Sequence, residues 1–167
     1  MPLPLRLLMF LVLWVPCFVW AESPTHCKRG ELTYFSCQIG SLGKVASICS
    51  GPLRSTNDGG DQPTWLQYRF GRLDSPEFAF PTPIKGSLSK FRGEHHQGQT
   101  VNSSTVIFRN ATTEYTVGTI HPVGTGAAFD GVIVSRPQHE LLWLPCTSRP
   151  IIFSAFSKLV ESLEPVP

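Results

Sequence analysis

The side chains of this sequence best suited to chemistry are its histidines and the acids beside them. His95 and His96 follow Glu94, and His121 and His139 lie further along the chain. A zinc ion needs three or four such ligands, each about 2.0–2.3 Å from the metal. Adjacent residues of an extended chain point to opposite sides, so His95 and His96 seldom bind one ion. We therefore predict no metal and no cofactor, and interpret these histidines as solvated loop residues.

A second use of the same residues would be acid–base catalysis. A small extracytoplasmic hydrolase would have to gather Glu94, His95, His96, His121 and Asp130 in one pocket. Partners in general acid–base catalysis must come within about 3 Å of each other, or be joined by one water. The sequence contains no Gly-x-Ser-x-Gly elbow or other complete catalytic motif. We assign no catalytic residue and keep the hydrolase as the alternative hypothesis.

A third candidate, for binding, is the stripe formed by Trp65, Gln67 and Arg69. These residues alternate with apolar ones along a clear strand pattern. If the apolar side is the core face, Trp65 and Arg69 stand exposed together, and these residue types are enriched at binding hot spots. The alternative is a strand buried on both sides, with Arg69 paired to an acid such as Glu77 or Glu114.

Four cysteines of the mature chain predict two disulfides: Cys27, Cys37, Cys49 and Cys146. No Cys-x-x-Cys pair occurs, so the spacing is not that of a zinc site. Three of the four lie near the N-terminus, so one bridge must join that region to Cys146. Of the three connectivities we favour Cys37 with Cys49 across the first hairpin, and Cys27 with Cys146.

Residues 1–21 have the features of a secretory signal peptide. Arg6 precedes an apolar run from Leu7 to Trp20, and Ala21 ends a cleavage site before Glu22. We therefore expect a single disulfide-tied β domain over residues 22–167, located in the periplasm or secreted. The apolar run is too short to span a bilayer, so no membrane anchor is expected after cleavage.

Charge limits the partners of the mature chain. The sequence holds 14 basic and 12 acidic residues, and loss of Arg6 leaves a net charge near +1. Nucleic-acid binding needs a concentrated basic face, so we exclude it. The partner that remains is a protein or a cell-envelope glycan.

The elements that must position these side chains are mostly short strands separated by Gly- and Pro-containing turns. The spacing of the apolar residues changes to that of a helix at 151–163, and Ser148 is the expected N-terminal cap of this helix. The sequence is thus mainly β, and we predict one small antiparallel barrel or curved sheet of about seven or eight strands with a C-terminal amphipathic helix. Surface loops are expected at 51–64 and 83–99. The strand patterns are 31–39, 44–50, 65–71, 77–80, 103–109, 114–120, 129–134 and 139–144.

Three motifs carry a resemblance to known proteins. The pattern CxxGExxYFSC at 27–37, the KVxxIC segment at 44–49 and the LQYRFG segment at 66–71 resemble a group of small secreted proteins of Gram-negative bacteria. This resemblance implies a periplasmic or secreted location and no particular activity. The YFSC segment ending at Cys37 is also similar to one in periplasmic lysozyme inhibitors of the C-type class, which are small disulfide-tied barrels. That likeness is one of fold.

We therefore predict a non-catalytic binding module, of which an inhibitor or adaptor acting on a cell-wall-active protein is one version. The first alternative is the small hydrolase with a histidine-based site. The second is an envelope structural protein with no discrete ligand. The oligomeric state is left open.

Overall fold

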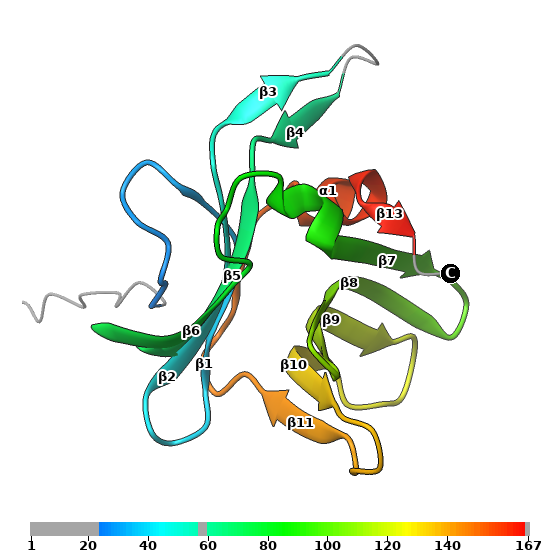
Figure 1. Cartoon of the computed structure of the whole chain (residues 1–167). Coiled ribbons are helices and arrows are strands. Elements are labelled where there is room, and N and C mark those ends of the chain that lie inside the picture. The colour runs from blue at the N-terminus through cyan, green and yellow to red at the C-terminus, as the bar shows by residue number, and fades with distance from the viewer. Residues whose placement is uncertain (1–23, 57–59, 166–167) are drawn as a thin grey trace, which may run out of the picture.

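The computed structural model describes residues 24–56 and 60–165, so the expected signal peptide lies outside the described residues. Figure 1 shows two sheets that face each other across the core, and their strands pair antiparallel except for the short last strand, which pairs parallel. The first sheet has the order β12 (Ile151–Ile152), β1 (Leu32–Ile39), β2 (Lys44–Ser50), β5 (Leu66–Arg72), β6 (Ser75–Phe80). The second has the order β11 (Leu142–Pro145), β10 (Phe129–Ser135), β9 (Thr113–Pro122), β8 (Val101–Asn110), β7 (Phe91–Gln97), β13 (Glu164–Pro165).

The core lies between the inward faces of the two sheets and is closed at one end by α1 (Phe156–Ser162). Phe35 and Ile48 of the first sheet face Val106 and Val132 of the second, and all four are fully buried. Burial of one such side chain contributes about 1.5–3 kcal/mol, so this core supplies most of the driving force for folding. Alternate residues of each strand point inward, as the period-2 patterns require.

The prediction of a mainly β fold with antiparallel curved sheets and one C-terminal helix is confirmed. The two sheets do not close into a barrel, and the structure holds more strands than expected within the described residues. A hairpin of β3 (Leu53–Ser55) and β4 (Asp61–Pro63) occupies the expected loop at 51–64. In the expected loop at 83–99 lie a 3-10 turn, η1 (Ser87–Lys90), and the whole of β7. Strand β7 has a polar sequence, but it is held by full antiparallel pairing with β8.

The predicted start of the C-terminal helix, at residue 151, is too early. Ile151 and Ile152 instead form β12, which pairs with the exposed edge of β1 and supplies partners to its backbone groups. Ser148 does not cap the helix, because its hydroxyl accepts a hydrogen bond from the Gln38 backbone N–H at 3.0 Å. The helix proper starts at Phe156. No helix in the part of the chain that the structure describes has the length and apolar character needed to cross a membrane.

The disulfides join the four predicted cysteines, but with a different connectivity. Cys27 is bonded to Cys49, and Cys37 to Cys146. The favoured pairing across the hairpin is wrong because Cys37 lies opposite Ala46, while Cys49 lies opposite Thr33. Four residues of strand separate the two positions by about 13 Å, whereas a disulfide requires Cα atoms within about 7 Å. The expected bridge from the N-terminal region to Cys146 is present.

Candidate functional site

Two of the three residues in the stripe of Trp65, Gln67 and Arg69 are buried, so the expectation that Trp65 and Arg69 stand exposed together is wrong. Gln67 and Arg69 are only 6% and 8% exposed, and Trp65 is partly buried. The Arg69 Nε–H donates to Gln67 Oε1 at 2.8 Å, and the Gln67 amide donates to the Pro81 carbonyl at 2.9 Å. The Arg69 guanidinium also lies over the Trp65 ring, 5.9 Å from its centroid. These side chains have their partners within the protein.

The segment before β1 covers this outer face of the first sheet (Figure 1). Its Pro24 carbonyl accepts a hydrogen bond from Ser36 at 2.8 Å, and its His26 N–H donates to Ser47 at 3.0 Å. The same segment is tied to β2 by the bond between Cys27 and Cys49. Strands β1, β2 and β5 are therefore covered on both sides.

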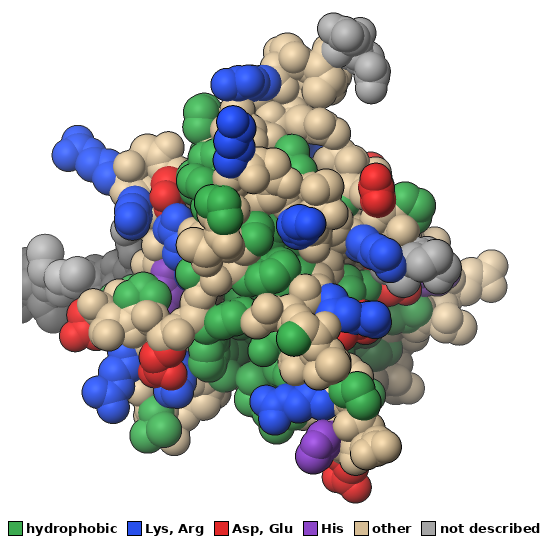
Figure 2. All heavy atoms as spheres, viewed as in Figure 1, with side chains coloured by type: hydrophobic (Ala, Val, Ile, Leu, Met, Phe, Trp, Pro, Cys, Tyr) green, Lys and Arg blue, Asp and Glu red, His purple; other side chains and the backbone are tan. Residues whose placement is uncertain are grey.

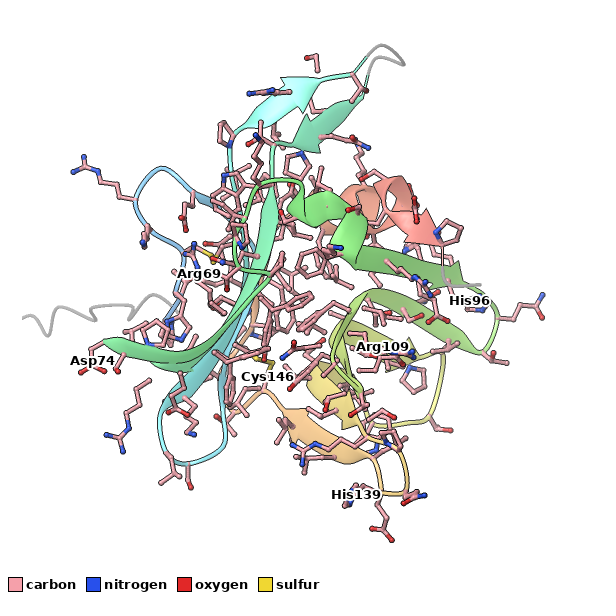
Figure 3. All side chains as sticks on the ribbon, viewed as in Figure 1. Arg69, Asp74, His96, Arg109, His139 and Cys146 are labelled. Carbon is pink, nitrogen blue, oxygen red and sulfur yellow. A yellow bond between two sulfur atoms is a disulfide. The ribbon has the colours of Figure 1, made fainter. Side chains whose placement is uncertain are left out.

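Arg69, labelled in Figure 3, is held by a nearly buried ion pair with Glu31. Its two terminal nitrogens contact the two oxygens of Glu31, and Nη1 also donates to the His26 carbonyl at 2.9 Å. Burial by itself raises the pKa of Glu31, but hydrogen bonds from Arg69 and from the Lys28 backbone outweigh it, so the pKa is lowered. Glu31 is therefore ionised at neutral pH, and the pair fixes the N-terminal segment on the sheet.

His26 makes the stability of this region sensitive to acid. Its side chain is 7% exposed, Nε2 is 3.2 Å from the Gly71 carbonyl, and Nδ1 has no partner among the described residues. Burial, and to a smaller extent the charge of Arg69, lowers the pKa of His26. The unfolded chain therefore takes up the proton first. We expect stability to be constant above pH 6.5 and to fall below it by up to about 1.4 kcal/mol per pH unit.

Urea unfolding at pH 7.5, 6.5 and 5.5 would measure this effect, with the non-titrating variant His26→Gln as control. The variant should lose the steeper decline below pH 6.5, although it is less stable throughout. An equal decline in both proteins would show that other groups cause the acid sensitivity.

The histidines of β7 point to opposite sides of the second sheet. His96 is exposed, as is Glu94, while His95 is partly buried. His95 Nδ1 is 2.8 Å from Ser104 Oγ, and its Nε2 is 3.4 Å from the carboxylate of Glu161 on α1. These residues lie on a regular strand and not in the expected loop. His95 joins β8 and α1 and does not share a site with His96.

The other two residues of the hypothetical hydrolase form a separate pair. His121 Nε2 is 2.8 Å from Asp130 Oδ1, across the neighbouring strands β9 and β10. Strand β8 lies between His121 and His95, and no hydrogen bond among the described residues links the two groups. The five side chains are thus divided among three places, and none of them lines the main cleft described next.

A cleft of about 680 Å³ opens between the two sheets beside the loop that joins β1 to β2. Figure 2 shows hydrophobic side chains gathered in the hollow between the sheets. The apolar and aromatic lining comes from both sheets and consists of Ile39, Tyr68, Phe70, Phe78, Tyr115, Val132, Val134, Leu142 and Leu144. The volume lies within the range of about 300–1,000 Å³ that is typical of sites for small ligands.

Packed aromatic rings stiffen one wall of this cleft. The Tyr115 ring stacks on Phe108 and Phe78, with centroids 4.9 Å and 5.5 Å apart, and Tyr68 packs against the same group. Tyr68 is 2% exposed, and its burial raises the pKa of the phenol far above its ordinary value, so it stays neutral. Fixed rings of this kind present a preformed apolar surface to a ligand.

Charged and exposed apolar side chains surround the mouth of the cleft. Lys44 Nζ forms an ion pair with Glu77 at 2.7 Å, and the exposed Arg136 also lines the cleft. Leu42, at the tip of the β1–β2 loop, is 77% exposed, and Leu142 of β11 is 50% exposed. The site therefore has an apolar interior and a mouth that carries both charged side chains and exposed leucines.

The sequence patterns did not reveal this cleft. Its two walls come from different sheets, and even the nearest lining residues across it, Phe78 and Tyr115, lie in separate strands that only the tertiary fold brings together. One local signal was present, because Leu42 is a large apolar residue in a Gly-Ser-Leu-Gly turn where polar residues are usual.

Comparison with known proteins adds no functional information. The sequence matches no family model, and neither the curated proteins nor the solved structures contain a significant match. The resemblance to small secreted proteins of Gram-negative bacteria therefore stays a prediction, and function has to be inferred from the geometry of the site.

Proposed function

We propose that this protein is a non-catalytic binding module of the periplasm or the extracellular space, and that the apolar cleft is its binding site. The two disulfides support an oxidising compartment outside the cytoplasm. The observation that carries the proposal is the cleft itself, which has a wide opening and an aromatic wall.

The cleft exposes apolar side chains of both sheets to solvent, and the exposed Leu42 and Leu142 extend this apolar surface at its opening. Exposed apolar surface concentrated at one place is typical of interaction sites. We therefore infer that a ligand or partner with apolar groups fills the cleft when the protein acts.

An inhibitor or adaptor of a cell-wall-active protein would use the same site. In that version an apolar side chain of the partner enters the cleft, as anchor residues do in many interfaces. The general binding module and the inhibitor or adaptor therefore use the same cleft and differ only in what they bind. Nothing in the positions of His95, His121 and Asp130 supports the hydrolase over either of them.

The proposal predicts that filling the cleft abolishes binding of an apolar probe. Val134 lines the cleft, whereas the adjacent Ile133 points to the opposite face of β10, so Val134→Trp and Ile133→Trp form a matched pair. We expect N-phenyl-1-naphthylamine, a neutral fluorophore, to bind to the native protein and to Ile133→Trp. Its affinity for Val134→Trp should be at least about tenfold lower, the loss of one good apolar contact.

Fluorescence titration measures these affinities, and circular dichroism checks folding. If Val134→Trp does not fold, Leu142→Trp at the half-exposed mouth replaces it. Failure of the native protein to bind the probe, or equal binding by all variants, would contradict the proposal.

A further inference from the structure

We infer that the cleft binds a long-chain carboxylate, with its alkyl chain between the sheets and its carboxylate at Arg136. This inference rests on the proposed function and adds the chemical class of the ligand. It depends on how apolar and charged side chains are distributed along the cleft.

The interior of the cleft fits an alkyl chain. The deepest lining residues, Val132 and Tyr68, are 0% and 2% exposed, and no charged side chain among the described residues lines that part. The charged lining residues Lys44, Glu77 and Arg136 have solvent-exposed or half-exposed side chains and therefore lie at the mouth. A ligand that satisfies both regions has an apolar chain and one polar end.

The charged side chains at the mouth favour a ligand whose polar end is negatively charged. Lys44 is already paired with Glu77, with 2.7 Å between the two groups. Arg136 has no carboxylate within ion-pair distance among the described residues, so one positive charge is left uncompensated. The guanidinium fork matches the two oxygens of a carboxylate.

The size and the outer edge of the cleft favour a single chain. A volume of about 680 Å³ suits one alkyl chain better than the paired chains of a bilayer lipid. Leu42 and Leu142 stand at the opening and would cover the part of the chain nearest the head. Figure 2 shows basic side chains at the edge of the same hydrophobic hollow.

Three probes with the same twelve-carbon chain test the inference: dodecanoate, dodecanol and dodecyltrimethylammonium, each below its micelle concentration. Their affinities are measured by displacement of N-phenyl-1-naphthylamine. For the native protein we expect dodecanoate to bind about fivefold more tightly than dodecanol, the effect of one exposed ionic contact, and dodecyltrimethylammonium to bind most weakly.

Arg136→Gln should remove the preference for dodecanoate and leave the affinity for dodecanol unchanged. The control is Arg54→Gln, which makes the same change in net charge at an exposed residue of β3 that does not line the cleft. It should keep the native order of affinities.

The outcomes separate this inference from the proposed function. If the neutral probes bind but Arg136→Gln keeps the preference, or no preference exists, the carboxylate inference is wrong and the binding module stands. If Arg54→Gln abolishes the preference as well, net charge and not Arg136 is responsible, which also overturns the inference. If no probe binds, the proposed function itself fails.

Discussion

Replacing both Cys37 and Cys146 by alanine will lower the free energy of unfolding by about 5 kcal/mol, because the bond closes a loop with a sequence separation of 109 residues. The bond ties β1, which lies between β12 and β2 in the first sheet, to the chain that leaves β11 of the second. Without it the unfolded chain gains entropy. Among the described residues, the backbone pairing of Ile39 with Cys146 and nearby hydrogen bonds still join the two sheets at this end.

The matched control is the double replacement of Cys27 and Cys49 by alanine, whose sequence separation is 22. The dependence of loop-closure entropy on loop length gives a loss of unfolding free energy of about 3 kcal/mol for this shorter loop. Guanidinium chloride unfolding, followed by tryptophan fluorescence, measures both values. A smaller loss for the pair at Cys37 and Cys146 than for the control would mean that loop closure does not determine the effect.

The sheet elements could be predicted where the local pattern and the final environment agree. The hairpin of β1 and β2 has alternating residues on both sides of a turn with glycine at each end, Gly40 and Gly43. Both glycines have positive φ, 63° and 67°, which explains the residue type at those positions. In such segments the sequence alone contains the information that determines the structure.

The predictions from sequence are wrong where contacts between distant segments override the local pattern of polar and apolar residues. Strand β7 is polar and contains a glycine, yet it forms because β8 and α1 pack against it. Its Gly93 leaves no room for a side chain beside the Val160 carbonyl. The sequence suggests Glu77 or Glu114 as the acid that pairs with Arg69, but the partner is Glu31, which belongs to the segment that folds over the sheet. Neither contact leaves a periodic signal in the sequence.

The cleft could not be predicted for a related reason. Tyr68 and Phe70 were correctly placed on the inward face of their strand, yet an inward side chain can either fill a core or line an opening. The difference depends on whether the opposite sheet approaches closely, which is set by α1 at one end and by the disulfide of Cys146 at the other. Local sequence does not encode that separation.

Replacing Arg69 by methionine is expected to lower the free energy of unfolding by about 3–5 kcal/mol, because it leaves the carboxylate of Glu31 nearly buried and without its partner. The two side chains of the native pair are only 9% and 15% exposed. The double variant Arg69→Met/Glu31→Leu removes both charges. It should recover most of the loss, since a buried pair replaced by apolar groups of similar size is often neutral. Urea unfolding of the four proteins gives the coupling energy between the two residues.

The exposed pair of Arg109 and Glu114 provides the control, since their side chains are 68% and 40% exposed. Arg109→Met should cost less than about 1 kcal/mol, as exposed ion pairs usually do. A similarly small cost for Arg69→Met would mean that water reaches the Glu31 carboxylate and that the N-terminal segment does not seal the sheet. A large cost that the double variant does not recover would point to the other hydrogen bonds of Arg69, to Gln67 and to the His26 carbonyl, as the main contribution.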